Sequence, residues 1–177
     1  MGEHRATRLA YERGILEIKM PSKLHEPINR LLERIITTLT EELGMNVLPL
    51  GSTTFNREPQ GVEPDSCFYI QNSDRVNLED NEPLDLPPDL VVEVDITCSS
   101  RSRLNIYKIM GVAEIWGYNR QGFAILQLRE GEYVECESSL TPKISAQFLT
   151  ALVEQGKQAN NQNAVIRELR NYLHDGD

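Results

Sequence analysis

The pattern of apolar and polar positions is most distinctive in residues 87–96, which read PPDLVVEVDI. Two prolines end any preceding helix or strand, and the short β-branched run after them is typical of a strand buried on both faces. One face of this strand carries Leu90, Val92, Val94 and Ile96. Glu93 and Asp95 share the opposite face, about 6.6 Å apart. Their burial would require a proton, a basic partner or a metal ion, and the alternative is a solvated strand end.

A second pattern predicts an amphipathic helix earlier in the chain. Its apolar stripe consists of Ile28, Leu31, Leu32, Ile35, Ile36, Leu39 and Leu43. Gly44 offers a C-terminal stop, and Pro27 is tolerated only in the first turn, so we expect the helix to begin between Ser22 and Glu26 and to pack on a sheet. His25 would then point toward the buried face. We interpret it first as a core histidine with satisfied hydrogen bonds, and second as a catalytic group.

The rest of the chain alternates between short strands and helices. The predicted strands cover residues 14–20, 47–50, 53–55, 67–70, 112–118, 123–128 and 133–136. Residues 57–61 are typical of a polar turn and 71–85 of an exposed loop. Hydroxyl groups at 97–100 can cap a helix that ends at Gly111. Two further helices are expected in the C-terminal part, separated by the polar residues 156–163.

Length and composition predict one globular domain over residues 1–177. A hydrophobic content of 40% with 25% charged residues is ordinary, and the chain is long enough for a core without disulfides. No apolar run could span a bilayer and the charged N-terminus does not resemble a signal peptide, so we expect a cytoplasmic protein without membrane contact. The odd and widely spaced cysteines, Cys67, Cys98 and Cys136, are predicted to be small core residues.

Charge adds a constraint on partners. The formal net charge of -9 opposes non-specific binding to nucleic acid, which depends on Lys and Arg. Between Arg57 and Asp95 the chain carries eleven acidic residues and two basic ones. A phosphate group approaching this region would need cations to screen the carboxylates.

Two acids in this region lie on strands that are close in sequence. Asp65 introduces one predicted strand, and Glu93 lies 28 residues later in the central strand. Oxygen ligands of this kind suit Mg²⁺, which can activate a bound water and neutralise phosphate charge while a nearby cation stabilises the transition state. On the following helix Arg103 and Tyr107 share a face, whereas Lys108 is rotated away from Arg103.

Four segments that together span most of the chain carry a family resemblance. They are His25-Glu26, Glu63-Pro64-Asp65, residues 88–94 (PDLVVEV) and residues 111–116 (GVAEIW). With them the sequence resembles the bacterial putative restriction endonuclease family, a branch of the PD-(D/E)xK nuclease superfamily. The resemblance implies an α/β fold, a restriction-endonuclease-like mixed central sheet flanked by helices, with Asp65 and Glu93 as ligands of Mg²⁺ or Mn²⁺. It also makes DNA the expected substrate and a homodimer plausible.

The chain departs from this family at the basic residue. The lysine that the superfamily has two residues after the second acid is here Asp95. Relatives often place a lysine on the following helix, four residues before a tyrosine; that tyrosine corresponds to Tyr107, and the matching position is Arg103. Arginine can stabilise a phosphate but cannot readily become a neutral base. Metal binding is therefore better supported than turnover.

Three functions remain open on this basis. The first is a divalent-metal-dependent phosphodiesterase of nuclease type, with Asp95 assisting the metal site and Arg103 as electrophile. The predicted site residues are Asp65, Glu93, Asp95 and Arg103, with His25 and Lys108 as further candidates. The second function is a catalytically degenerate binding or scaffold protein with a nuclease fold. The third is an acidic interaction protein that does not contact nucleic acid.

Overall fold

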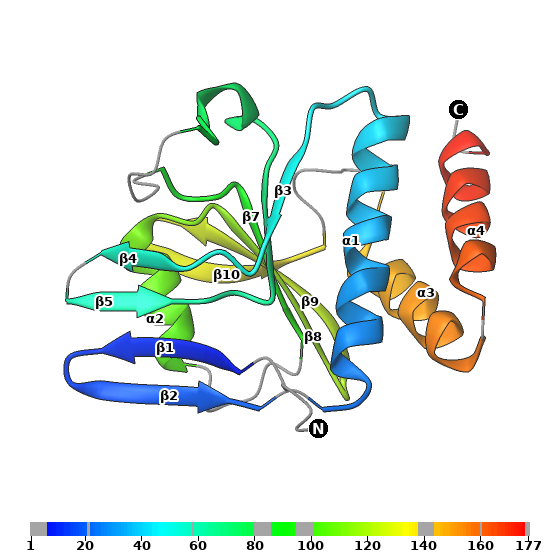
Figure 1. The fold of residues 1–177 in the computed structure, drawn as a ribbon. Helices are drawn as coiled ribbons and strands as arrows, with labels where there is room; N and C mark the ends of the chain where they lie inside the picture. Colours follow the sequence, from blue (N-terminus) through cyan, green and yellow to red (C-terminus); the bar gives the residue numbers. More distant parts are fainter. Residues whose placement is uncertain are drawn as a thin grey trace.

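The computed structural model describes residues 7–20, 22–57, 59–79, 86–94, 101–137, 144–159 and 161–175. Within these residues ten strands form two sheets, and four α-helices pack against them. Two helices, α1 (His25–Glu42) and α3 (Ala146–Gln158), cover one side of the larger sheet, and α4 (Gln162–His174) packs against both of them (Figure 1). The remaining helix, α2 (Arg101–Met110), lies on the other side together with the smaller sheet. This arrangement confirms the predicted class, a mixed sheet flanked by helices.

The larger sheet has six strands in the order β10-β9-β8-β7-β6-β3. The strands are β3 (Leu48–Gly51), β6 (Ser66–Tyr69), β7 (Leu90–Val94), β8 (Glu114–Asn119), β9 (Gly122–Arg129) and β10 (Glu132–Cys136). The pair β7 and β8 is parallel, whereas the other neighbouring pairs are antiparallel. Helix α2 connects this parallel pair, as parallel strands require a crossover. The predicted meander of β8, β9 and β10 is confirmed.

The alternation predicted for the central strand is also confirmed. All five residues of β7 are buried. Leu90, Val92 and Val94 join the core beneath α1, α3 and α4, whereas Val91 joins the core beneath α2 and the smaller sheet. Glu93 therefore projects on the same side as Val91. Asp95 and Ile96, predicted to continue the two faces, lie outside the described residues.

Helix α1 forms as its apolar stripe predicts, with Pro27 in the first turn. Its stripe residues Ile28, Leu31, Leu32, Ile35, Ile36 and Leu39 are all buried. The predicted separator 156–163 is too long, because α3 continues to Gln158. Gly156 lies inside this helix at a close approach to α1, where an added Cβ would be 2.3 Å from Cδ2 of Leu31. A glycine here therefore lets the two helices come together.

The smaller sheet is the part of the fold that the apolar pattern does not predict as a unit. It has the order β2-β1-β5-β4, with β1 (Arg8–Glu12), β2 (Ile15–Lys19), β4 (Phe55–Arg57) and β5 (Gln60–Val62). The strand expected over 14–20 is confirmed as β2. The polar turn expected over 57–61 is wrong, because Gln60 and Gly61 belong to β5. Gly61 pairs with Asn56, whose Oδ1 would lie 2.6 Å from an added Cβ, so the glycine allows these short strands to pair closely.

Three further expectations can be compared with the structure. Cys67 is buried in the core, as predicted, whereas Cys136 is half-buried because it lies on β10, the edge strand of the larger sheet. Cys98 lies outside the described residues. Residues 71–79 form a loop that contains a short 3₁₀-helix, η1 (Ser73–Arg75). Among the described residues, none of the helices combines the length and the apolar character needed to cross a membrane.

Candidate functional site

The pairing of β6 with β7 brings the two predicted acids together. Ser66 pairs with Val92 in an antiparallel register, which places Asp65 opposite Glu93. The backbone N–H of Val94 donates a 2.8 Å hydrogen bond to Asp65 Oδ2. Asp65 and Glu93 are each 1% exposed, so both carboxylates are removed from bulk water. A buried carboxylate pair needs cationic partners, and the structure supplies them.

Asp65 is surrounded by positively charged and potentially charged groups. Its Oδ2 lies 2.8 Å from Lys19 Nζ and 2.9 Å from His25 Nε2, and its Oδ1 lies 3.6 Å from Arg8 Nε. Burial by itself would raise the pKa of Asp65, but His25 and Lys19 outweigh burial and lower the pKa to about 2. Asp65 is therefore a carboxylate near neutral pH. Its Oδ1 has no hydrogen-bond partner among the described residues.

Glu93 is held by two side chains from α2. Arg103 Nη1 donates to Glu93 Oε1 over 2.8 Å, and the Tyr107 hydroxyl donates to the same oxygen. This contact confirms the prediction that Arg103 and Tyr107 share a face of the helix. Burial tends to lower the pKa of Arg103, but the charge of Glu93 raises it, so the guanidinium stays cationic. Burial and then Glu93 raise the pKa of Tyr107 well above its ordinary value, so the phenol stays neutral.

Arg103 also links the site to the smaller sheet. Its Nε donates to Glu17 Oε1 over 3.1 Å, and its Nη1 donates to the carbonyl oxygen of Glu63 over 3.1 Å. Arg103 is only 1% exposed, and its Nη2 has no hydrogen-bond partner among the described residues. Because Arg103 is itself held at several points, it fixes the orientation of Glu93.

Three residues of this cluster were not predicted from the sequence, namely Arg8, Glu17 and Lys19, and Lys19 makes the most contacts with the two acids. Its ammonium donates to Asp65 Oδ2 over 2.8 Å, to Glu93 Oε2 over 3.2 Å and to the carbonyl oxygen of Val94. An ammonium has three donors, and these three acceptors account for all of them. The period-two alternation of residues 14–20 was the available signal, because it places Glu17 and Lys19 on one face of a strand.

His25 is buried and reaches the site from the first residue of α1. It is 0% exposed, as its predicted position on the helix requires. Its Nε2 is close to Asp65, but within the described part of the chain neither ring nitrogen has a well-aligned hydrogen bond. The prediction that His25 is buried is therefore confirmed. The expectation that its hydrogen bonds are satisfied is not met among the described residues.

Of the remaining predicted candidates, Lys108 does not join this cluster. Lys108 lies 3.0 Å from Glu132 of β10 in a partly exposed ion pair, in agreement with its predicted rotation away from Arg103. Asp95 lies outside the described residues. Asp89, the acid at the start of the central strand, is structural: its Oδ2 accepts hydrogen bonds from the backbone N–H groups of Ile70 and Asn72.

The donor set fits an oxygen-liganded divalent cation. Oδ2 of Asp65, Oε2 of Glu93 and the carbonyl oxygen of Val94 converge on one position, where the Lys19 ammonium lies. Mg²⁺ is usually held by one or two carboxylates and keeps several water ligands. The described residues contain no group of three or more His, Cys, Asp or Glu side chains arranged around a metal position. A cation would therefore depend on two carboxylates and a carbonyl oxygen.

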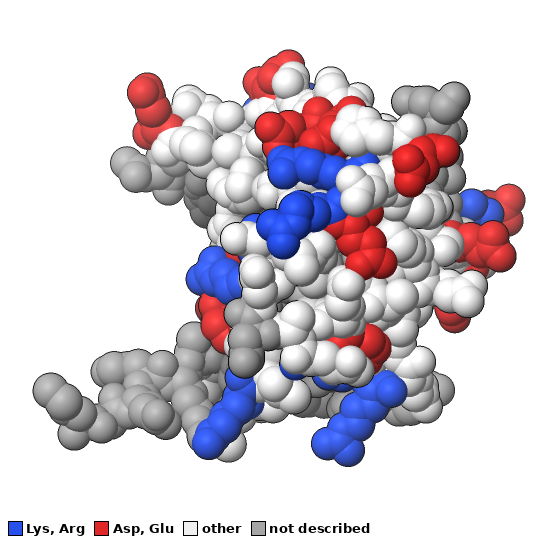
Figure 2. Space-filling model, turned by 90° about the vertical axis from the view of Figure 1, so that its right-hand side faces the viewer, with Lys and Arg blue, Asp and Glu red and all other residues white. Residues whose placement is uncertain are grey.

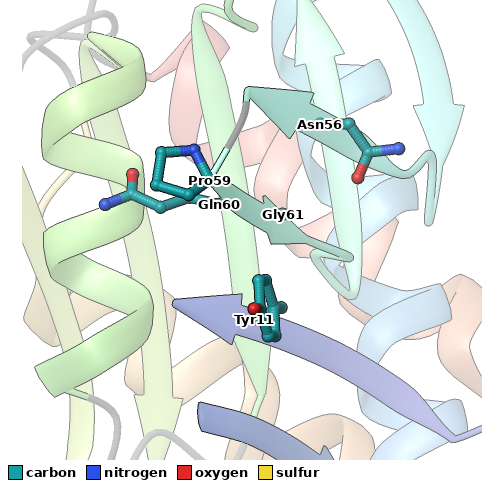
Figure 3. Close-up of a pocket in the computed structure, with 5 residues that line it drawn as sticks. All are labelled: Tyr11, Asn56, Pro59, Gln60 and Gly61. Atoms are coloured by element: carbon teal, nitrogen blue, oxygen red, sulfur yellow. The ribbon is translucent and has the colours of Figure 1, made fainter. Parts of the chain in front are cut away.

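Hollows that described residues line lie elsewhere on the surface. One, of about 520 Å³, is lined by Tyr11, Asn56, Pro59, Gln60 and Gly61 of the smaller sheet (Figure 3). None of the carboxylates of the site lines it. On the face that α1 and α4 present, basic and acidic side chains are interspersed (Figure 2). Arg170, for example, lies 2.7 Å from Glu42, so this face is not a continuous basic surface.

The mixed sheet, with an acid at the start of β6 and another in β7, places the protein in the restriction-endonuclease-like class. The chain belongs to the Uma2 family: the family model described as "Putative restriction endonuclease" matches residues 1–174. The fold is also similar to the crystal structure of a putative nuclease belonging to DUF820 from Anabaena variabilis, with a TM-score of 0.56. The two chains are 14% identical over 93% of this chain and 90% of the other, so this likeness concerns the fold alone. A search of curated proteins finds no match.

Proposed function

We propose that this member of a nuclease-type family is a phosphodiesterase that depends on a divalent metal and acts on DNA. The observation that carries the proposal is the juxtaposition of Asp65 and Glu93 across β6 and β7, both buried and held by cationic groups. Two acidic side chains buried together against cationic partners are costly for a fold, and such sites are frequently functional.

In this proposal Asp65 and Glu93 hold Mg²⁺ or Mn²⁺, with the Val94 carbonyl oxygen as a third ligand. The bound ion would lower the pKa of a water molecule and neutralise charge on a phosphate. Asp95, which follows Val94 in the chain, remains a proposed assistant to the metal site. Metal charge at this position would also offset the net charge of -9, which otherwise repels a nucleic acid.

Arg103 and His25 have distinct proposed tasks. Arg103 orients Glu93 through the 2.8 Å contact, and its remaining donor, Nη2, could serve as electrophile toward a phosphate oxygen. His25 stabilises the ionised form of Asp65. Lys108 pairs with Glu132 at the surface, so we assign it no part in the chemistry.

A catalytically degenerate binding protein is the second candidate. It is favoured by a specific observation: the two carboxylates are already neutralised by Lys19, Arg103 and Arg8 without any metal. We further propose a homodimer and a single domain over residues 1–177, which sedimentation analysis and a single cooperative unfolding transition would test.

The decisive experiment combines metal binding and cleavage. Calorimetry with Mn²⁺ should show binding that is lost in Asp65→Ala and in Glu93→Ala, whereas Asp74→Ala, at an exposed acid in η1, should bind like the parent. Cleavage of plasmid, linear duplex, single-stranded DNA and RNA should be compared with Mg²⁺, Mn²⁺ and EDTA. Metal binding that survives both site variants would contradict the assignment. Binding without cleavage of any substrate would favour the degenerate protein.

A further inference from the structure

The Lys19 ammonium lies at the position where the proposed metal ion would bind, and the proposed function does not explain why. We propose that Lys19 is an internal occupant of the divalent-metal position, so that a metal ion enters the site only when the Lys19 side chain leaves. This inference rests on the proposed function, because it concerns the same pair of carboxylates.

The first argument is the set of acceptors. Lys19 Nζ contacts one oxygen of Asp65, one oxygen of Glu93 and the Val94 carbonyl oxygen, and these are the atoms that would bind the ion. All three donors of the ammonium are used in these contacts. The ammonium and the metal ion would therefore need the same oxygen lone pairs, and they cannot hold them together.

The second argument is the charge balance. Among the described residues, three acidic groups, Glu17, Asp65 and Glu93, are matched by three cationic side chains, Arg8, Lys19 and Arg103. His25, which is charged only if protonated, also contacts Asp65. A divalent ion added to this balanced cluster would bring an excess of two positive charges into a buried environment, where like charges repel strongly. When the Lys19 ammonium leaves, the excess falls from two positive charges to one. The repulsion between the ammonium and the metal ion, the closest in the site, is also removed.

The third argument is that Lys19 can move without disturbing the core. It is the last residue of β2, which lies at the edge of the smaller sheet, and its side chain is 16% exposed, compared with 0% for Asp65 and 1% for Glu93. Its neighbours Ile18 and Met20 are 58% and 71% exposed. Among the cations that contact Asp65 and Glu93, Lys19 therefore lies on an edge strand with exposed neighbours, and its side chain can leave the site by a change of rotamer.

Two measurements test the inference. In calorimetry, Lys19→Met and Lys19→Gln should bind Mn²⁺ at least about tenfold more tightly than the parent, because the competing cation is gone. Lys23→Met, at an exposed lysine four residues away, should leave the affinity unchanged. In the parent protein, acetylation of Lys19, followed by peptide mass spectrometry, should accelerate severalfold when Mn²⁺ is added, while acetylation of Lys23 should not. This second measurement does not depend on the folding of any variant.

The outcomes separate the inference from the function on which it rests. Tighter Mn²⁺ binding in both Lys19 variants, with metal-dependent labelling of Lys19, supports the inference. Equal or weaker binding in these variants, while Asp65→Ala abolishes binding, overturns the inference and leaves the metal site in place. Unchanged labelling of Lys19 at saturating Mn²⁺ overturns it as well. Absence of Mn²⁺ binding in the parent and in both Lys19 variants overturns the metal-dependent function and the inference together.

Discussion

Arg103 and Glu93 form a buried ion pair in which Nη1 lies 2.8 Å from Oε1 and each residue is 1% exposed. The two residues are ten positions apart, one on β7 and the other on α2. Removal of one partner from such a pair leaves an uncompensated charge in a low-dielectric environment. The orientation of Glu93 and the stability of the protein are therefore coupled through Arg103.

Replacement of Arg103 by alanine should lower both the free energy of unfolding and the cleavage rate. Arg103→Ala should lower the free energy of unfolding by about 3 kcal/mol, since it leaves Glu93 buried with fewer partners. Its cleavage rate should fall about 100-fold or more if the guanidinium acts on the transition state. Arg103→Lys restores a cation and should keep or raise activity. Urea unfolding and cleavage rates at saturating metal measure the two effects.

Lys108→Ala is the matched control on the same helix. Its partner Glu132 has a 75% exposed side chain, and exposed ion pairs contribute little. The free energy of unfolding should change by at most about 0.5 kcal/mol, with full activity. A loss of activity in Lys108→Ala together with a mild effect of Arg103→Ala would reverse the assignment of the working cation.

Helix α1 offers a direct test of the core. Ile35 is 0% exposed, so Ile35→Asp places an unpaired charge among apolar groups and should cost several kcal/mol. Glu41→Gln, at an exposed position of the same helix, should change the free energy of unfolding by at most about 0.5 kcal/mol. Chemical unfolding measures both. Equal stability of Ile35→Asp and the parent would mean that this face of the helix does not pack on the sheet.

The close approach of α3 to α1 predicts coupling between two positions. Gly156→Ala introduces a Cβ against Leu31 and should destabilise the protein by about 1–3 kcal/mol through overpacking. In a Leu31→Val background the added Cβ meets a shorter side chain and should cost less. A double-mutant cycle on unfolding free energies measures the difference, and strictly additive effects would contradict the proposed contact.

The reactivity of the cysteines should follow their burial. Burial raises the pKa of the Cys67 thiol to about 12, so this group stays protonated and inert at pH 8 and becomes a thiolate only near pH 12. Cys136 is half-buried on an edge strand and should react with iodoacetamide much faster. Peptide mass spectrometry distinguishes the two sites, and urea should abolish the difference. Rapid labelling of Cys67 in the native protein would show that β6 opens readily.

The sequence predicts those parts of the fold whose periodicity is long and regular. Helix α1, the central strand β7 and the meander from β8 to β10 were predicted, because each carries an unbroken apolar pattern. The smaller sheet was not, because β4 and β5 have three residues each and the pairing of β5 with β1 is long-range. Short strands carry too few positions for a period to emerge.

The site shows the same division. The shared face of Arg103 and Tyr107 follows from helix geometry, and the family resemblance pointed to Asp65 and Glu93 on neighbouring strands. Lys19 is 46 residues from Asp65 and 74 from Glu93, so nothing local connects them. The docking of the β1-β2 hairpin places this ammonium between the carboxylates. The alternation within β2 predicts the face of the strand on which Lys19 lies, but not the partner of that face.

These separations also imply an order of assembly. Closing the 74-residue loop between Lys19 and Glu93 costs about 1.8 kcal/mol more chain entropy than closing the ten-residue loop between Glu93 and Arg103. Glu93, Arg103 and Tyr107 all belong to the β7-α2 segment, and this half of the site can form during early collapse, before distant segments arrive. The hairpin completes the cluster afterwards. Its detachment would be a partial unfolding step that separates Lys19 from the two acids while the helical side of the core remains intact.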